Sequence, residues 1–173
     1  MRKTHIPGRS NVLSNNAMVA TSQPLSSQEA INILKNGGNA VDAAIAASAV
    51  LSVVEPGSTG IGGDCFAIIK MNGKKALSVN GSGIAPKKAN FEYFQKNKIS
   101  KIGLLSPHSV TVPGAVSAWY GIHKKFGKLD FQKLFITAEN YARNGFPVHE
   151  IEAYHWKKNV EKLKKNQITR KQF

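Results

Sequence analysis

The sequence contains a single cysteine, Cys65, among its 173 residues. One cysteine excludes an internal disulfide framework and fits a reducing compartment, so we expect a cytoplasmic protein. No stretch reaches the roughly 18 consecutive apolar residues that a spanning helix requires, so we expect no membrane partner. The first twenty residues are polar, are interrupted by Pro7 and have no apolar segment, so they do not resemble a secretory signal.

Acidic residues and arginine are also scarce. Ten acidic residues face 24 basic ones, which gives a net charge of +14, and only four of the basic residues are arginines. Proteins that read nucleic-acid sequence usually rely on arginine, because its planar guanidinium binds guanine and stacks on bases. Lysine charge alone supports only sequence-independent attraction, so we expect no nucleic-acid partner.

What remains is an ordinary globular composition, with 42% hydrophobic residues, in a chain of a length typical of one domain. The patterns divide it into an irregular lead-in over residues 1–16, a folded region over 17–165 and a frayed basic tail over 166–173. A β-hairpin packed with several helices indicates an α+β or layered α/β fold.

A short strand and a helix are predicted near the N-terminus. The strand is Met18–Ser22. The helix begins at Pro24 with a capping box formed by Ser26 and Glu29, and it ends at Gly37-Gly38.

The second helix, from Ala40 to about Val53, consists almost entirely of small and apolar residues. Asn39 is its expected N-cap, and Asp42 is well placed to interact with the positive end of the helix dipole. Because small side chains cover nearly the whole circumference, we expect this helix in the middle of a layer. We also expect the layers that cover it, and those that cover the hairpin, to lie outside this chain.

A glycine-rich loop over residues 57–64 leads from this helix into the hairpin. The predicted strands, 65–70 and 75–80, flank Asn72-Gly73, which favours a tight two-residue turn. Helical patterns then occupy part of 87–101 and the segments 113–126, 131–144 and 149–165, with Gly145 as a stop signal.

The residue patterns alone give no complete metal or phosphate site. The glycine-rich loop lies between a helix and a strand, whereas a dinucleotide-binding loop lies between a strand and a helix. We therefore favour a structural role, with close backbone approach as the reason for its glycines. His149 and His155 are six residues apart, on nearly opposite faces of a helix, and a zinc helix needs one face. His5, His108 and His123 have no ligand at suitable spacing, so no metal is expected.

Possible nucleophiles are equally isolated. Cys65 begins an apolar strand and has neither a base nor an electropositive neighbour in the sequence, so a buried structural cysteine is favoured. The threonines, at positions 4, 21, 59, 111, 137 and 169, stand apart from any serine-hydrolase elbow. The residues by themselves assign no catalytic side chain.

The order of several motifs carries more information than any one of them. In sequence order they are Pro7–Ser10, Met18–Leu25, Gly37–Ala44, Val54–Asp64, Asn80–Gly83 with Ala85-Pro86, Val112–Ala115, Phe126–Phe131 and Ala142–Val148. The most specific are Gly-Gly-Asn-Ala-Val-Asp-Ala-Ala from residue 37 and Glu-Pro-Gly-Ser-Thr-Gly-Ile-Gly-Gly from residue 55. From about residue 9 to about 165, this series resembles the γ-glutamyltransferase family, also called γ-glutamyltranspeptidases or glutathione hydrolases.

The resemblance implies part of an N-terminal-nucleophile hydrolase, a four-layer αββα sandwich that needs no cofactor. In that family a precursor cuts itself before a threonine, whose hydroxyl becomes the nucleophile and whose α-amine becomes the base. The enzyme takes the γ-glutamyl group from glutathione or a related amide and passes it to water or an amino acid.

The sequence departs from the family in its extent. It matches only the front of the family's large subunit and contains no Thr-Thr processing site. The resemblance therefore implies a truncated chain with no catalytic residue of its own, inactive alone. Its expected partners are the missing small-subunit half of the same fold and a small γ-glutamyl or related amide substrate.

A second departure concerns substrate binding. The family places an arginine, which binds the substrate α-carboxylate, three residues before an Ala-Pro pair, and Ser82 stands there before Ala85-Pro86. Ser82 is thus the one candidate substrate-binding residue, and it offers no charged clamp. Two alternatives stay open: an amidase or acylase of the same fold, and a non-catalytic remnant that only associates.

Overall fold

The computed structural model describes residues 12–172, so most of the predicted lead-in lies outside the described residues. Its helices and strands are α1 (Pro24–Lys35), α2 (Ala40–Val54), β1 (Cys65–Ile69), β2 (Leu77–Gly81), α3 (Phe91–Lys96), α4 (Ala115–Phe126), α5 (Ile136–Asn144), α6 (Glu150–Leu163) and α7 (Gln167–Gln172), with short 3-10 helices η1 (Pro107–Ser109) and η2 (Phe131–Phe135). The architecture is a partial α+β fold. No helix of this described part is long and apolar enough to cross a membrane.

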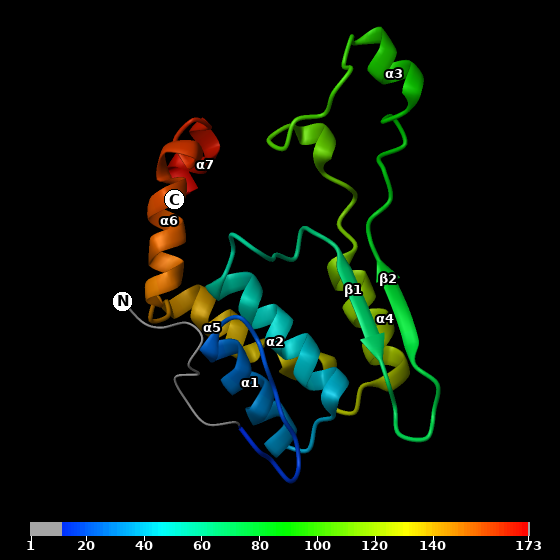
Figure 1. Ribbon diagram of the computed structural model, residues 1–173, viewed down its shortest axis with the longest axis vertical. Coiled ribbons are helices and arrows are strands. Elements are labelled where there is room, and N and C mark those ends of the chain that lie inside the picture. The colour runs from blue at the N-terminus through cyan, green and yellow to red at the C-terminus, as the bar shows by residue number, and fades with distance from the viewer. Residues whose placement is uncertain (1–11, 173) are drawn as a thin grey trace, which may run out of the picture.

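Helix α2 lies at the centre of a helical body formed by α1, α2, α4, η2 and α5 (Figure 1). Nine of its fifteen residues are buried, which confirms the predicted central position. Trp119 of α4 and Leu134 of η2 belong to the same core cluster. The layers that cover α2 therefore lie within this chain, and the expectation that they lie outside it is wrong.

Helix α1 begins at Pro24 as predicted, but its cap is Gln23. The Gln23 side-chain oxygen accepts hydrogen bonds from the amides of Leu25 at 2.6 Å and Ser26 at 3.3 Å. Ser26 is fully buried, and its hydroxyl donates to the Ala47 carbonyl of α2 at 2.9 Å. The predicted capping box is wrong, because Gln23 is the N-cap and Ser26 lies within the first turn of the helix.

Helix α2 is capped as the sequence predicts. The Asn39 side-chain oxygen accepts from the amides of Val41 at 2.9 Å and Asp42 at 3.1 Å, and Asp42 Oδ2 accepts from the Asn39 amide at 3.0 Å. These reciprocal bonds form a capping box. Asn39 and Asp42, the two polar residues of the Gly-Gly-Asn-Ala-Val-Asp motif, thus cap the N-terminus of the central helix.

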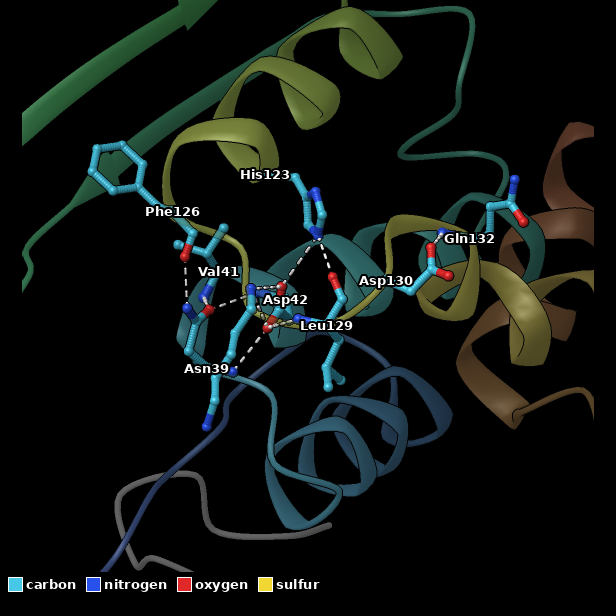
Figure 2. Close-up of polar contacts among 9 residues, drawn as sticks. Asn39, Val41, Asp42, His123, Phe126, Leu129, Asp130 and Gln132 are labelled. Carbon is cyan, nitrogen blue, oxygen red and sulfur yellow. Dashed lines mark hydrogen bonds and ion pairs between the residues drawn. The ribbon is translucent and has the colours of Figure 1, made fainter.

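The Asp42 carboxylate also holds a distant loop. It is fully buried and accepts from the Lys128 amide at 3.1 Å and the Leu129 amide at 3.2 Å (Figure 2). The His123 ring nitrogen Nε2 lies 3.6 Å from Asp42 Oδ1 and 2.8 Å from the Leu129 carbonyl oxygen. Several donors on one buried carboxylate offset the cost of removing it from water. We refer to Asn39, Asp42, His123 and the loop 126–129 as the clasp.

The clasp joins α2 to the connection between α4 and η2. The Asn39 amide group donates to the Phe126 carbonyl at 2.6 Å, which adds a second bond across the same gap. A Cβ at Gly127 would overlap the His123 ring, so the loop requires glycine there. These contacts bring the Phe126-Gly127 pair against the Asn39–Asp42 motif.

The hairpin also forms where predicted. Strands β1 and β2 pair antiparallel, with Cys65 opposite Gly81 and Ile69 opposite Leu77, and Gly73 in the turn has a φ of 69°. One face packs on the core, whereas Phe66 and Ile68 on the other face are 69% and 81% exposed. For the hairpin, this outward face is left uncovered by the described residues.

The predicted strand at Met18–Ser22 does not form. Across residues 12–172 the sheet contains only β1 and β2, so this segment has no neighbouring strand with which to pair. An isolated extended segment cannot satisfy its backbone groups in a ladder, and a turn at Ser22-Gln23 leads it directly into α1.

Between β2 and α4, residues 84–112 form an arm that extends away from the helical body (Figure 1). It contains α3 and η1. Its own small cluster consists of Tyr93, Phe94 and His108, whose ring centroids lie 5.5–5.7 Å apart. Leu104 and Leu105 are 95% and 71% exposed, so much of the apolar surface of the arm is uncovered.

The C-terminal segments follow the predicted helices with two differences. The segment 131–144 divides into η2 and α5, and Gly145 ends α5 with a φ of 82°. The last residues, predicted as a frayed tail, contain the short helix α7. Its N-terminal backbone amides at Ile168 and Thr169 donate to the Asn166 side chain, at 2.9 and 3.1 Å.

Candidate functional site

Ser82, the predicted substrate-binding position, directly follows β2, in a side-chain-mediated Asx-turn that spans Asn80–Gly83. Its amide donates to the Asn80 side-chain oxygen at 2.9 Å, and its side chain is exposed. The turn borders a groove of about 390 Å³ between β2 and α4, which Ser82, Ser117 and Lys125 line with neighbouring small and apolar residues. The structure places Ser82 at the rim of a groove, and its role in binding stays a prediction.

Three glycines pack this turn against the start of α4. A Cβ at Gly81 would overlap Ala118, one at Gly83 would overlap the Val112 carbonyl, and one at Gly114 would overlap the Gly81 carbonyl. The backbone of the turn therefore lies directly against α4, and Ser82 is the residue of the sequence Gly81-Ser82-Gly83 that presents a side chain.

The glycine-rich loop 57–64 differs from the expectation in one respect. Beside Gly57, Gly60 and Gly62 there is open space within 4 Å of an added Cβ, so close backbone approach does not explain these three glycines. The loop instead borders a hollow of about 390 Å³. Its last glycine, Gly63, accepts hydrogen bonds through its carbonyl from the amides of Gly114 and Ala115, both at 3.0 Å. The amides of Gly114 and Ala115, at the start of α4, are thus hydrogen-bonded within the protein itself.

The histidines lie apart. His149 caps α6, accepting from the Ile151 amide at 3.3 Å, and His155 is an exposed residue further along that helix. His108 belongs to the aromatic cluster of the arm, and His123 to the clasp. In residues 12–172 no group of three or more His, Cys, Asp or Glu side chains is arranged to hold a metal ion. His5 lies outside the described residues.

Cys65 is half-buried at the start of β1. Burial raises the pKa of its thiol, while a hydrogen bond with the Trp119 side chain acts in the opposite direction. A thiol with a raised pKa carries little thiolate at neutral pH and is a poor nucleophile. The geometry agrees with the structural interpretation of this cysteine.

Sequence reasoning missed the Asp42–His123 contact. The sequence offered no ligand for His123, because the carboxylate that meets it belongs to a helix 81 positions earlier. It also missed Asp64, whose Oδ1 accepts from the Gly83 amide at 2.8 Å and from the Thr111 hydroxyl at 3.2 Å. The only sequence signal for Asp64 was its place at the end of the Glu55–Gly63 motif.

Solved structures that resemble this chain define its class. The chain superposes with a TM-score of 0.82 on Helicobacter pylori gamma-glutamyltranspeptidase, at 29% identity, over 94% of this chain and 47% of that one. It superposes with a TM-score of 0.86 on a cephalosporin acylase from Bacillus halodurans, at 41% identity, over 92% of this chain and 30% of that one. The fold is part of an N-terminal-nucleophile hydrolase, the class that the sequence motifs implied.

The family follows from the sequence comparisons. The profile of the Gamma-glutamyltranspeptidase family matches residues 26–173, and the chain belongs to that family. It is 40% identical over 155 residues to the glutathione hydrolase-like YwrD proenzyme of Bacillus subtilis, which covers 88% of this chain and 29% of that protein. The chain spans less than a third of the length of the curated relatives that it matches.

Proposed function

We propose that this chain forms the N-terminal part of a glutathione hydrolase and γ-glutamyltransferase, and that a second half of the same fold supplies the threonine nucleophile. The observation that carries the proposal is the family match over residues 26–173. The catalytic base of such enzymes is the free α-amine of the nucleophilic threonine. The described threonines 21, 59, 111, 137 and 169 all lie inside a continuous chain, so none has a free α-amine.

The uncovered surface supports a partner half. Phe66 and Ile68 on the hairpin, and Leu104 and Leu105 on the arm, expose large apolar side chains. Exposed apolar surface of this kind marks interaction sites on soluble proteins. The relatives extend far beyond this chain, so a partner of the same fold has ample mass to cover these residues.

We further propose a weak preference for γ-glutamyl substrates. Ser82 offers a neutral hydroxyl where the family places a guanidinium, and a charge-assisted contact of that kind contributes about 1.5–3 kcal/mol. An amidase or acylase activity on the same fold is the second candidate. It is favoured by the cephalosporin acylase of Bacillus halodurans, 41% identical to this chain.

The test is an assay with a chromogenic γ-glutamyl anilide. We expect no turnover by the isolated 173-residue chain above an empty-vector control, because nucleophile and base are both absent. Together with a complementing half that carries the threonine junction, turnover should appear, and a Thr→Ala change at that junction should remove it. Turnover by the isolated chain, or none by the verified assembly, would contradict the proposed function.

A second measurement addresses the substrate. In the active assembly, Ser82→Arg should raise the ratio of kcat/KM for a γ-glutamyl amide over its des-carboxy analogue by up to about two orders of magnitude. An unchanged ratio would show that residue 82 does not face the acyl group. Activity on side-chain acyl amides without turnover of γ-glutamyl amides would favour the acylase alternative.

The cellular site is proposed as the cytoplasm. The support is the single cysteine, Cys65, which forms no disulfide in the described chain. Fractionation of the native host with an antibody to the chain tests this location.

A further inference from the structure

Gly63 and Asp64, at the end of the glycine-rich loop, contact both segments that frame the Ser82 turn. The Gly63 carbonyl accepts from the amides of Gly114 and Ala115 at the start of α4. The Asp64 carboxylate accepts from the Gly83 amide and from the Thr111 hydroxyl through the same oxygen, Oδ1. Two consecutive residues thus connect the loop before β1, the turn after β2 and the segment before α4.

Other contacts also restrict the backbone of the turn. The Asn80 side chain holds the Ser82 amide at 2.9 Å, and the Ile84 carbonyl accepts from the Val112 amide at 3.0 Å. Gly83 lies so close to the Val112 carbonyl that no side chain fits there. The Ser82 hydroxyl, by contrast, has only a 3.5 Å contact to the Gly83 carbonyl. The backbone is fixed while the one side chain of the turn is left accessible.

The carboxylate is the charged element of this arrangement. A hydrogen bond from a backbone amide to an ionised carboxylate is stronger than one to a neutral acceptor. Asp64 therefore adds a charged contact to the neutral ones that hold the Gly83 amide, and with it the preceding Ser82, beside the groove between β2 and α4. All of these contacts lie within the one chain, so the turn has its shape before any partner half binds.

We propose that Asp64 is a positioning residue, which holds the Ser82 turn in the orientation that meets the acyl group of the substrate. The role rests on the proposed function, because the substrate reaches this turn only in the active assembly. Asp64 itself acts through Gly83 and Thr111. The contacts by which Asp64 holds the turn lie within this chain, so they can be tested without the active assembly.

The first experiment measures amide hydrogen exchange by NMR in the full 173-residue chain. In the unaltered chain, the Gly83 amide should exchange more slowly than those of Gly60 and Gly62 in the open loop. Asp64→Ala should speed exchange at Gly83 about tenfold, the value expected for loss of a bond to a charged acceptor. Ala43, whose amide is held by the Asn39 carbonyl in α2, is the internal control and should not change.

Asp64→Asn keeps a neutral acceptor oxygen at the same place and should restore part of the protection at Gly83. Ser82→Ala changes the presented side chain but not the turn, and should leave Gly83 exchange unaltered. Exchange at Gly83 as fast as at Gly60 in the unaltered chain would overturn the proposal, whether or not the variants fold. Unchanged exchange in Asp64→Ala would overturn it as well.

The second experiment uses the active assembly. Asp64→Ala should lower kcat/KM for a γ-glutamyl amide about tenfold, mainly through KM, and Asp64→Asn should recover part of the loss. The positioning role would be overturned if Asp64→Ala speeds amide exchange at Gly83 but leaves kcat/KM unchanged. If the unaltered assembly has no γ-glutamyl activity, the proposed function fails, and the role of Asp64 in that reaction fails with it; the exchange experiment still decides whether Asp64 holds the turn.

Discussion

The helical body and the region formed by the hairpin and arm differ in how completely their apolar side chains are covered by the rest of the chain. In the body, α2 is covered on several sides, and the clasp supplies partners for a fully buried carboxylate. In the hairpin and arm, residues such as Ile68 and Leu104 remain 81% and 95% exposed. One chain thus contains a region closed upon itself and a region whose apolar surface is not covered by the described residues.

The difference shows that local order does not require a complete fold. The hairpin has its predicted register and turn although one of its faces is uncovered. The turn Asn80–Gly83 is held by contacts inside the chain. An uncovered region is therefore not a loosely formed one, and the two regions should respond differently to substitution.

The largest effect is expected at the clasp. Asp42→Ala removes the buried acceptor of the Asn39, Lys128 and Leu129 amides and should lower the free energy of unfolding by about 3–5 kcal/mol. Urea unfolding followed by circular dichroism measures the change. The matched control is Asp130→Ala, which removes an exposed cap of η2 and should cost about 0.5–2 kcal/mol. Equal losses in the two variants would show that the clasp is not what closes the body.

A smaller effect is expected where the arm leaves the hairpin. Gly83→Ala would place a methyl group against the Val112 carbonyl and should cost about 1–3 kcal/mol, chiefly by displacing the arm. Limited proteolysis should then cut within residues 84–112 faster than in the unaltered chain. Gly60→Ala, in open space, is the control and should leave the cleavage rate unchanged. Similar rates in both variants would argue against tight packing of the turn.

The exposed hairpin face should affect association more than stability. Replacing Phe66 and Ile68 together with serine should reduce self-association of the isolated chain, since both side chains point away from the core. Stability should change by no more than about 0.5 kcal/mol per residue. Light scattering across a concentration series measures association. Ile69→Ser, on the inward face, is the control and should destabilise the chain instead. A monodisperse unaltered chain would contradict the expected association.

The smallest effect concerns the thiol at the border of the two regions. Burial raises the pKa of Cys65, so the folded state holds the thiol proton more tightly and little thiolate forms near neutral pH. Alkylation by iodoacetamide should be several-fold slower in the folded chain than in urea at the same pH, and mass spectrometry gives both rates. Equal rates would indicate that Cys65 is accessible.

Local signals were predicted correctly because their partners lie within a few residues. The Asn39 cap, the Asn72-Gly73 hairpin and the stop at Gly145 each depend on contacts or φ values within a few residues. The family motifs likewise predicted the fold class. For the candidate site, sequence reasoning named Ser82, whose role in binding stays a prediction, but it did not name Asp64, which accepts a hydrogen bond from the Gly83 amide.

The incorrect predictions concern residues whose structure depends on distant parts of the chain. Ser26 carries a capping signal, yet its hydroxyl bonds to Ala47 of a neighbouring helix. Met18–Ser22 has the composition of a strand but lacks a strand beside it among the described residues. Each was decided by a neighbour that local pattern does not reveal.

The sequence by itself determined the hairpin, the approximate positions of most helices and the family to which the chain belongs. The tertiary structure alone decided that Asp42 caps one helix and also holds a loop 86 residues away, and that Asp64 binds Gly83 and Thr111. The physical reason is that a carboxylate accepts several hydrogen bonds at once. Sequence spacing shows the nearby donor, while the distant donors meet it only when the chain has folded.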